Sequence, residues 1–578
     1  MGSYLNPGSA SFRNSLRSKI YVDKSELIAR TNELICTEQR YVCVSRPRRF
    51  GKSMAANMLA SYYEKEENSD DLFGGLRISR AITYRDHLNQ YDVIKINMQE
   101  FLSVTNSVDE MLGRLKRYLL FDLLDAYGNL HFRDSEDLIQ VMKDIFAKTK
   151  CPFVILIDEW DCLFREYKKD REAQKKYLDF LRVWLKDQDY VALAYMTGIL
   201  PIKKYGSHSA LNMFTEYSMT NPREMAEFFG FTEDEVKMLC ARYKRSFEET
   251  KAWYDGYELI TVEENQKKIY SMYSPKSVVD AMLSGVFDNY WNQTETYEAL
   301  KTYIRLNYDG LKDSVIKMLG GDKVQINTGT FSNDMATFQG KDDVLTLLVH
   351  LGYLSYHWPD KTVYIPNKEV SQEYINAIST MEWPEVIDSV ENSRKLLEAL
   401  WRMDSDTVAK GIDKVHQEVS ILQYNDENSL SCTINLAFYF AREYYTVIRE
   451  LPSGKGFADI CFLPRKLHLD KPAAIIELKW NKNASGAIAQ IKRQQYSEVL
   501  KDYHGDLLLA GINYDKKTKL LDLGYLIRRI NSGEKVSLKI PFRNIGNTFI
   551  SNLVSILCGR GCAPGHSMAV GRSENTCS

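Results

Sequence analysis

The feature that most constrains this chain is a short apolar run followed at once by a basic loop and a helical pattern. Residues 41–45 read as a buried strand, the loop runs SRPRRFGKS over 45–53, and residues 52–64 have helical spacing. A strand, a tight turn at Gly51 and a helix beginning there place backbone N–H groups around a phosphate. The pattern G-x4-G-K-[ST] is met except at its first position, which is Arg46. The junction therefore predicts an ATP site.

The loop side chains complete that prediction. We expect Lys52 to bridge phosphate oxygens, Ser53 to place its hydroxyl on Mg²⁺, and Gly51 and Arg49 to belong to the nucleotide-binding set. The three loop arginines, which are Arg46, Arg48 and Arg49, either touch phosphate or form a salt-bridging patch at the surface or sheet edge. The sequence leaves these two readings open.

A second strand supplies the carboxylates that ATP hydrolysis needs. The run VILIDE over 154–159 is apolar and ends in two acidic residues. Asp158 is expected in the Mg²⁺ shell and Glu159 as the general base that polarises water. The alternative is a buried strand that ends in an acidic helix cap. Thr197 ends the strand expected at 191–197 and is a candidate γ-phosphate sensor, although threonine is common at strand ends.

The wider pattern predicts an α/β multidomain chain. In the first third, apolar strands alternate with helices, which indicates a parallel sheet covered on both faces. We expect a P-loop ATPase domain at 1–220, a helical middle at 221–415 and a compact α/β domain at 416–530. In the last domain a helix, three strands, a helix at 486–500 and another strand follow in order. Residues 540–578 are expected to form a disordered tail.

The C-terminal α/β region contains a second set of charged residues. Asp459 lies in one strand, and Glu477 and Lys479 lie in the next one, in the run AAIIELKW over 473–480. Alternation along a strand puts Glu477 and Lys479 on one face. Two carboxylates and a lysine can hold Mg²⁺ and activate water. The alternative is a salt-bridged pair on a solvated face.

This order of elements and residues resembles the PD-(D/E)XK nuclease superfamily. That resemblance implies that Gln490, in the following helix, assists the site and that Glu427, near the start of the preceding helix, is a further metal-binding carboxylate. The implied domain is restriction-endonuclease-like, with Asp459, Glu477, Lys479 and Gln490 in catalytic roles. Lysines and an arginine in the following helix can grip a nucleic-acid backbone, or form a solvated face.

Both sites together resemble one family, the bacterial AAA-ATPase-like proteins with a C-terminal PD-(D/E)XK nuclease-like domain. The motifs that carry the resemblance are YVDKSELI, SRPRRFGKS, LIDEWD, TGILPIKKYGSHSALNMF, GFTEDEV, WYDGY, RELPSGKGFADI and IELKWNK. They span residues from about 10 to 515. The resemblance implies ATP and Mg²⁺ as cofactors. It also implies that a neighbouring copy can supply an arginine, so that a homo-oligomer is an expected state.

Charge and hydropathy narrow the partners. Lys and Arg number 75 and Asp and Glu 77, which excludes a globally basic coat protein but allows a local basic groove for DNA or RNA. No apolar run reaches the ~18 residues of a membrane span. The scattered cysteines suit reduced thiols in a cytoplasm. The late group Cys558, Cys562, His566 and Cys577 matches no standard zinc spacing.

The leading functional prediction is an ATPase coupled to a Mg²⁺-dependent nuclease that acts on DNA or RNA. The alternative is an ATP-dependent switch whose nuclease-like domain binds nucleic acid or protein without cutting it. A small-molecule-modifying enzyme is disfavoured, because the sequence has no G-x-S-x-G nucleophile turn and its nine histidines are scattered.

Overall fold

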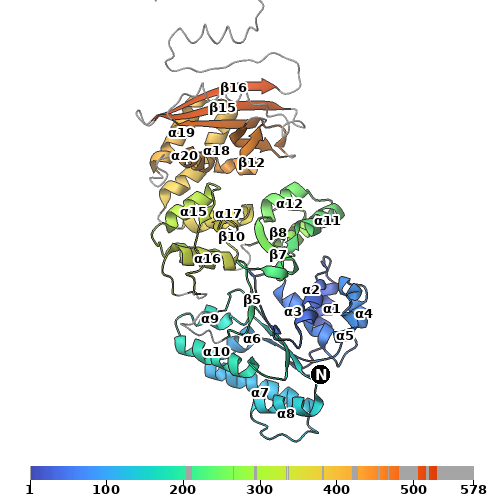
Figure 1. The fold of residues 1–578 in the computed structure, drawn as a ribbon. Coiled ribbons are helices and arrows are strands. Elements are labelled where there is room, and N and C mark those ends of the chain that lie inside the picture. Colours follow the sequence, from blue (N-terminus) through green and yellow to red (C-terminus); the bar gives the residue numbers. More distant parts are fainter. Residues whose placement is uncertain are drawn as a thin grey trace, which may run out of the picture. The chain divides into compact units, whose positions relative to one another are not determined.

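The computed structural model describes residues 2–202, 211–263, 266–291, 296–332, 335, 337–380, 383–418, 427–453, 456–465, 468–480, 505–515 and 520–529. They form two compact units. The first contains Met1–Arg394 and Lys414–Phe440, and the second contains Lys395–Asp413 and Ala441–Ser578. Figure 1 labels the elements of both units, and each unit is described by itself below.

The first unit begins with a five-stranded sheet in the order β2-β3-β4-β1-β5. All four pairings in it are parallel. Every residue of β1, β3 and β4 is buried, as expected for strands covered on both faces. The strands are β1 (Tyr41–Ser45), β2 (Asp92–Asn97), β3 (Phe153–Asp158), β4 (Val191–Gly198) and β5 (Thr215–Tyr217). The predicted parallel α/β sheet is confirmed.

Helices on both sides cover this sheet. Figure 1 shows α1 to α5 gathered on one side, and α7, α8 and α10 on the other. The helices are α1 (Ala10–Leu16), α2 (Glu26–Leu34), α3 (Lys52–Tyr63), α4 (Asp70–Phe73), α5 (Tyr84–His87), α6 (Met98–Ser103), α7 (Val108–Ala126), α8 (Leu138–Thr149), α9 (Cys162–Glu166) and α10 (Arg171–Leu185), with the 3₁₀ helix η1 (Arg77–Arg80). Because parallel strands all end at one edge, side chains that follow β1, β3 and β4 meet there.

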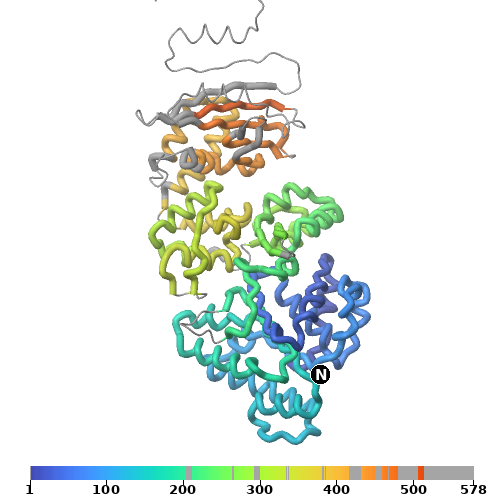
Figure 2. Tube along the Cα trace, viewed as in Figure 1, coloured from blue at the N-terminus to red at the C-terminus, as the bar shows by residue number. Residues whose placement is uncertain are grey.

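The middle of the chain is mainly helical, and Figure 2 traces it in colours that run from green through yellow to orange. Its helices are η2 (Arg223–Phe228), α11 (Glu233–Tyr243), α12 (Phe247–Tyr254), α13 (Pro275–Ser284), α14 (Thr296–Ile304), α15 (Leu311–Leu319), α16 (Lys341–Leu351), α17 (Lys368–Ser379), α18 (Pro384–Trp401), α19 (Ser405–Glu418) and α20 (Glu427–Ala437). The 3₁₀ helix η4 (Tyr439–Glu443) follows.

Two small antiparallel sheets interrupt these helices. Their orders are β6-β8-β7 and β10-β11-β9. The strands are β6 (Phe231–Thr232), β7 (Tyr257–Glu263), β8 (Gln266–Tyr273), β9 (Val324–Gln325), β10 (Ser355–His357) and β11 (Thr362–Tyr364). The sequence signal for them is weak, because four are only two or three residues long and the first half of β8 is exposed.

The second unit is built on a mixed sheet in the order β12-β13-β14-β15-β16. β14 and β15 pair in parallel, and the other neighbours are antiparallel. The strands are β12 (Tyr445–Ser453), β13 (Gly456–Pro464), β14 (Ala473–Trp480), β15 (Asp506–Asp515) and β16 (Leu520–Arg529). Four of these strands match the expected ones, and β16 extends the sheet beyond them. The helix expected at 486–500 and the expected tail at 540–578 lie outside the described residues.

Candidate functional site

The phosphate-binding loop joins β1 to α3 through a glycine in the left-handed region. Gly51 has φ +89° and is the N-cap of α3, where no side chain caps the first-turn N–H groups. A residue with a Cβ would be strained at this φ, although the space beside Gly51 is open. The uncapped N-terminus of this 12-residue helix therefore presents donors and a positive dipole end, as an anion site requires.

Lys52 folds back over this loop. Its side chain is buried, and its Nζ donates to the carbonyl oxygens of Arg46 at 3.0 Å and Pro47 at 2.9 Å. Burial lowers the pKa of Lys52, and three carboxylates oppose that shift, those of Glu159, Asp158 and Asp161. Lys52 thus lies within electrostatic reach of Asp158 and Glu159, which the sequence placed at the end of another strand. Ser53 is exposed in the first turn of α3.

The structure shows which groups Arg46, the first of the loop arginines, contacts. It is fully buried, and its guanidinium donates to the carbonyl oxygens of Tyr217 at 2.7 Å and Met225 at 3.2 Å. The guanidinium also lies 5.5 Å from the ring centre of Phe229. Burial lowers the pKa of Arg46 to about 10. Arg46 therefore ties β1 to β5 and η2 and is neither a phosphate ligand nor a surface salt bridge, so both readings were wrong for it.

The other two loop arginines have different environments. Arg49 is exposed and has φ +66°, and Arg48 is half-buried. Because Arg49 is exposed beside the N-terminus of α3, its guanidinium is not buried among backbone carbonyls as that of Arg46 is. The assignment of Arg49 to the nucleotide site stays a prediction.

Asp158 and Thr197 meet at the ends of β3 and β4. The hydroxyl of Thr197 donates to Oδ1 of Asp158, and the backbone N–H of Glu159 donates to the same oxygen at 3.1 Å. Both side chains are buried, with Thr197 0% and Asp158 5% exposed. Two donors fix one oxygen of the Asp158 carboxylate, which leaves its orientation settled before any ligand binds. Whether Thr197 also senses a phosphate stays a prediction.

Glu159 directly follows β3 in an unusual backbone conformation. Its φ is +53°, a region that non-glycine residues seldom adopt and that often marks functional turns. Its Oε2 accepts a hydrogen bond and forms an ion pair with the guanidinium of Arg165 on α9. Burial raises the pKa of Glu159, and Arg165 acts in the opposite direction.

Asp161 and Arg165 are members of this cluster that the sequence reasoning missed. Asp161 is fully buried, and its Oδ2 accepts the backbone N–H groups of Ile199 at 3.0 Å and Leu200 at 2.8 Å. Arg165 Nε lies 3.5 Å from the same oxygen. The signal was present as an acidic residue and an arginine four residues apart at the start of a short helix. Asp161 thereby joins the ends of β3 and β4.

The second unit brings Asp459 and Glu477 to adjacent strands. The β13–β14 pairing sets Ile460 opposite Ile476, so the next step of the same register sets Asp459 opposite Glu477. Asp459 Oδ2 accepts the backbone N–H of Leu478 at 2.6 Å. The Glu477 side chain is 0% exposed and pairs in register with Gly511 on β15. The two carboxylates therefore share one face of the sheet.

The remaining residues predicted for this site are placed less fully. Lys479 lies on β14 two positions after Glu477 and opposite Asn513, with its side chain outside the description. Glu427 is the first residue of α20, in a segment that clusters with the first unit, and its side chain is likewise not described. Gln490 lies outside the described residues.

Both carboxylate sets suit Mg²⁺ by their chemistry. In the described part of the chain, no group of three or more His, Cys, Asp or Glu side chains could hold a metal ion. Mg²⁺ is commonly held through one or two carboxylates, with waters and substrate phosphates completing the shell. Ser53 with Asp158, and Asp459 with Glu477, are donor sets of that kind.

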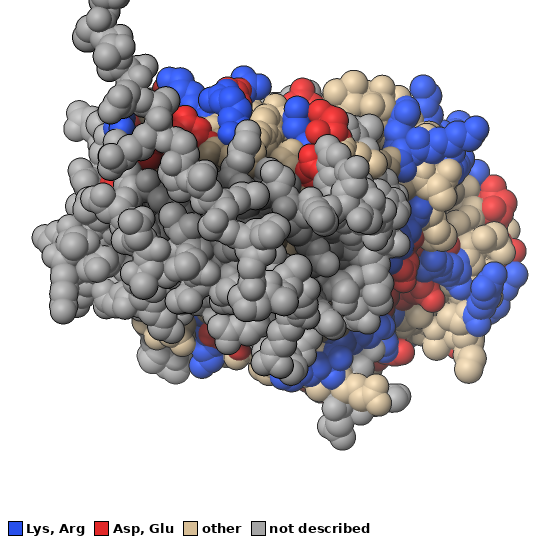
Figure 3. All heavy atoms as spheres, turned by 90° about the horizontal axis from the view of Figure 1, so that it is seen from above, with Lys and Arg blue, Asp and Glu red and all other residues tan. Residues whose placement is uncertain are grey.

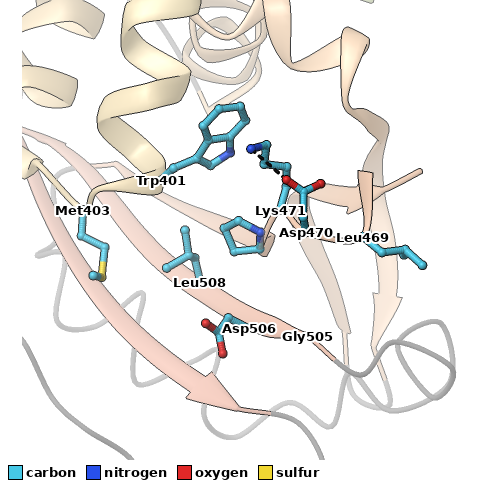
Figure 4. Close-up of a pocket in the computed structure, with 9 residues that line it drawn as sticks. Trp401, Met403, Leu469, Asp470, Lys471, Gly505, Asp506 and Leu508 are labelled. Carbon is cyan, nitrogen blue, oxygen red and sulfur yellow. Dashed lines mark ion pairs between the residues drawn. The ribbon is translucent and has the colours of Figure 1, made fainter. Parts of the chain in front are cut away.

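A cavity of about 390 Å³ lies elsewhere in the second unit. Figure 4 shows Trp401, Lys471 and Asp470 on one side of it, with Leu508 and Asp506 across from them. Leu508 and Gly511 are three residues apart on β15 and so point to opposite faces of the sheet. Because Glu477 shares the face of Gly511, this cavity is separate from the two carboxylates.

The surface charges that can be seen are mixed. On the face in Figure 3, Lys and Arg side chains of the described residues are interspersed with Asp and Glu. This agrees with the balance of 75 basic and 77 acidic residues in the whole sequence. The described residues of that face thus form no continuous basic surface.

Two family models match this chain, and they fall on its two sites. Residues 8–207 match the model described as a predicted AAA-ATPase, and residues 426–522 match that of the PD-(D/E)XK nuclease superfamily. The first covers β1 to β4 with their connecting helices, and the second covers α20 and the strands β12 to β15. These matches confirm the resemblance seen in the motifs, and with the two sheets they confirm the fold class.

A curated relative and several solved structures are similar to the chain, and the following three are among them. An uncharacterized protein in the vnfD 5′ region of Azotobacter chroococcum is 24% identical over 283 residues, which are 48% of this chain and 51% of that protein. The chain thus spans about half the length of this relative. A Walker-type ATPase of Pyrococcus abyssi is 12% identical, with 61% of this chain and 94% of that chain covered and a TM-score of 0.33. The ORC2 protein of Aeropyrum pernix, in ADPNP and ADP complexes, is 10% identical, with 64% and 97% covered and a TM-score of 0.25.

Proposed function

We propose that this chain, which joins a predicted AAA-ATPase domain to a PD-(D/E)XK nuclease superfamily domain, binds and hydrolyses ATP and couples it to Mg²⁺-dependent cleavage of DNA or RNA. The observation that carries the proposal is the meeting of four side chains at one edge of the parallel sheet. Lys52 follows β1, Asp158 and Glu159 follow or end β3, and Thr197 lies near the end of β4. A P-loop lysine beside two such carboxylates is the arrangement that nucleoside triphosphate hydrolysis requires.

The ATPase part of the proposal assigns each residue a task. The turn at Gly51 and the first turn of α3 bind the phosphates, and Lys52 exchanges its two loop carbonyls for phosphate oxygens. Ser53 and Asp158 would hold Mg²⁺, which supplies charge neutralisation on the phosphates when it is bound. Glu159 takes the proton of the attacking water. Arg49 and Thr197 contact the phosphate side of the nucleotide.

The nuclease part rests on the residues of β13 and β14. Asp459 and Glu477 would hold Mg²⁺ at the scissile phosphate, together with Glu427. Lys479 positions the attacking water, and Gln490 assists at the same centre. The support for this part is the shared face of Asp459 and Glu477 and the match of residues 426–522 to the nuclease superfamily.

One observation favours a second function, an ATP-dependent switch that binds nucleic acid or protein without cutting it. The Glu477 side chain is fully buried, and the carboxylate of Asp459 accepts a backbone N–H of the neighbouring strand. A carboxylate bonded to the backbone contributes to the sheet whether or not it binds metal. The two functions differ in whether the second unit cleaves anything.

Hydrolysis and cleavage assays on the full chain test the proposal. ATP turnover and cleavage of plasmid DNA, single-stranded DNA and single-stranded RNA are measured with Mg²⁺ for wild type, Lys52→Ala and Lys479→Ala. We expect Lys52→Ala to lose ATP turnover and Lys479→Ala to lose cleavage alone. Lys176→Ala is the control, because Lys176 pairs with Asp109 and Glu172 on the surface of α10 and α7. Cleavage that survives in both variants would refute the assigned roles, and turnover without any cleavage would select the switch.

The setting of the protein is also a proposal. In the portion that the structure describes, none of the helices combines the length and the apolar character needed to cross a membrane. We assign the chain to the cytoplasm, with a nucleic acid as partner and a homo-oligomer as its working state. The boundaries 1–220, 221–415, 416–530 and 540–578 stay predictions.

A further inference from the structure

The cluster at the sheet edge brings carboxylates and cations together before any nucleotide arrives. Its carboxylates belong to Asp158, Glu159 and Asp161, and its cations are Lys52 and Arg165, with Lys95 on β2 also within electrostatic reach of Asp158. Each of the three carboxylates acts on the pKa of Lys52 in the upward direction, and Arg165 acts on it in the opposite direction, so all five groups lie within electrostatic reach. What each cation does when ATP binds is therefore a question for the whole cluster. The following inference rests on the proposed ATP hydrolysis.

Arg165 is fixed more firmly than a side chain on a short surface helix would be. Its side chain is only 10% exposed, and it contacts Glu159 on one side and Asp161 on the other. Burial alone would lower the pKa of Arg165, but the carboxylates of Asp161 and Glu159 outweigh burial and raise it. Its guanidinium is therefore a permanent charge in this site.

The backbone around Arg165 is fixed as well. The N–H of Trp160 donates to the carbonyl of Thr197 at 3.0 Å, and the hydroxyl of Tyr177 donates to the carbonyl of Trp160 at 2.7 Å. Asp161 itself holds the two N–H groups that follow β4. The turn between β3 and α9 thus bonds to β4 and to α10. A partner on such a turn can hold a side chain in one orientation.

We propose that Arg165 is a positioning residue that holds Glu159 in place for catalysis. When Lys52 turns from its loop carbonyls to the nucleotide phosphates, it no longer balances Glu159. Arg165 is then the cation that remains paired with this carboxylate, and it prevents Glu159 from turning away from Asp158 and Asp161, which repel it. Arg165 Nη2 donates to Oε2 of Glu159, and the other oxygen, Oε1, accepts the proton of water.

Two other roles for the pair make different predictions. If Arg165 restrains Glu159 as a brake, removing it raises turnover. If the pair only stabilises the fold, removing it lowers the melting temperature, and any loss of turnover is the same whether or not Glu159 carries a charge. Positioning predicts a loss of kcat that depends on the Glu159 carboxylate.

A double-mutant cycle on the full chain separates these roles. Steady-state ATP hydrolysis, ATP affinity and melting temperature are measured for wild type, Arg165→Lys, Arg165→Met, Glu159→Gln and Glu159→Gln/Arg165→Met. Methionine is chosen because it keeps much of the buried volume of Arg165, whereas a smaller residue could prevent the chain from folding. Arg182→Met is the matched control, because Arg182 on α10 is 48% exposed and pairs with Asp179.

We expect Arg165→Met to lower kcat by about 10- to 100-fold, the range for a misplaced catalytic group, with KM for ATP changed less than about threefold. Arg165→Lys recovers part of the loss, and Arg165→Met adds less than about twofold in the Glu159→Gln background. Unchanged or raised kcat in Arg165→Met, or an equal loss in both backgrounds, overturns the inference alone. A wild-type chain that hydrolyses no ATP overturns the proposed function, and the inference with it.

Discussion

The two sites of this chain use acidic residues in opposite ways. At the edge of the parallel sheet, Lys52 and Arg165 lie among three carboxylates, and these groups come from α3, the end of β3, the turn that follows it and α9. In the second unit, Asp459 accepts a backbone N–H and Glu477 is buried within the sheet. In the first site the carboxylates are opposed by side-chain cations, whereas in the second the carboxylate of Asp459 is bonded to the backbone of the neighbouring strand. If ATP binds as proposed, Lys52 exchanges its two loop carbonyls for phosphate oxygens, whereas the carboxylate of Asp459 stays bonded to the sheet.

We expect the largest effect at Glu477, because this substitution tests whether the buried carboxylate of the second site binds Mg²⁺. Glu477→Gln keeps the shape of the side chain but removes its charge, so cleavage should fall by about 100-fold or more if the residue binds Mg²⁺. ATP turnover should stay at the wild-type level. Asp470→Asn is the control, because Asp470 is an exposed residue paired with Lys471 in the same unit.

Cleavage by Glu477→Gln at the wild-type rate would end the nuclease assignment for this residue. Loss of ATP turnover in the same variant would show instead that the two sites are not separable in the way the comparison supposes.

Substitution of Arg46 should give the next largest effect, a loss of stability. We expect this loss even when the new residue is the glycine that the phosphate-loop motif has at this position. Arg46→Gly makes the loop match G-x4-G-K-[ST] in full, yet it deletes the donors to the carbonyls of Tyr217 and Met225. We expect the free energy of unfolding to fall by about 2–4 kcal/mol, the range for breaking a buried charged hydrogen-bond set. Urea denaturation measures it.

Arg46→Met separates packing from hydrogen bonding at the same position. It keeps most of the buried volume, so a comparable loss in both variants assigns the effect to the missing donors. A chain with Arg46→Gly that is as stable as wild type would contradict the structural role of Arg46.

Thr197 should give a smaller, local effect. Thr197→Ala deletes one of the two donors that orient the Asp158 carboxylate, and we expect kcat for ATP to fall by about tenfold. Thr197→Ser keeps the hydroxyl and should stay within about threefold of wild type. Equal turnover in all three proteins would remove Thr197 from the ATP site.

The smallest effect concerns the pH dependence of stability and lies away from both sites. Burial raises the pKa of Glu64 to about 7, whereas the hydrogen bond from Ser9, followed by other contacts, lowers the pKa of Glu67. Because a raised pKa means that the folded state binds the extra proton, the Glu64 contribution is present at low pH and is lost as pH rises from about 4.5 towards 7. The Glu67 contribution has the opposite sign and is lost as pH falls.

Chemical denaturation from pH 4 to 8 checks these signs. Relative to wild type, Glu64→Gln should become more stable as pH rises through that window. Glu67→Gln should be less stable than wild type at the upper end of the pH range, and this difference should shrink as pH falls. Parallel pH profiles for the two variants would contradict the assignment.

The sequence predicted the first site better than the second because of how parallel sheets are built. Strands β1, β3 and β4 read as apolar runs, and their ends must share one edge, so Lys52, Asp158 and Thr197 could be brought together on paper. Asp161 and Arg165 were missed because they act through the turn between β3 and α9, whose backbone path no periodicity describes. Arg46 was misread because a buried arginine looks the same in sequence as an exposed one.

The second site depended on register, which a sequence gives less directly. The alternation along β14 placed Glu477 and Lys479 on one face, but the position of Asp459 opposite Glu477 follows from the pairing of β13 with β14. The short strands of the middle region escaped prediction because short or partly exposed strands carry little apolar pattern. β16 lies beyond the last strand that the sequence predicted.

Isothermal titration of ATP with Mg²⁺ into the full chain tests the central claim most directly. The claim is that the edge of the parallel sheet, with Lys52 folded over its own loop, is a nucleotide site. Wild type should bind with a measurable Kd, and Lys52→Ala should bind at least about tenfold more weakly, since the phosphates lose their charged partner. Wild type that takes up no ATP, or Lys52→Ala that binds as tightly as wild type, would contradict it.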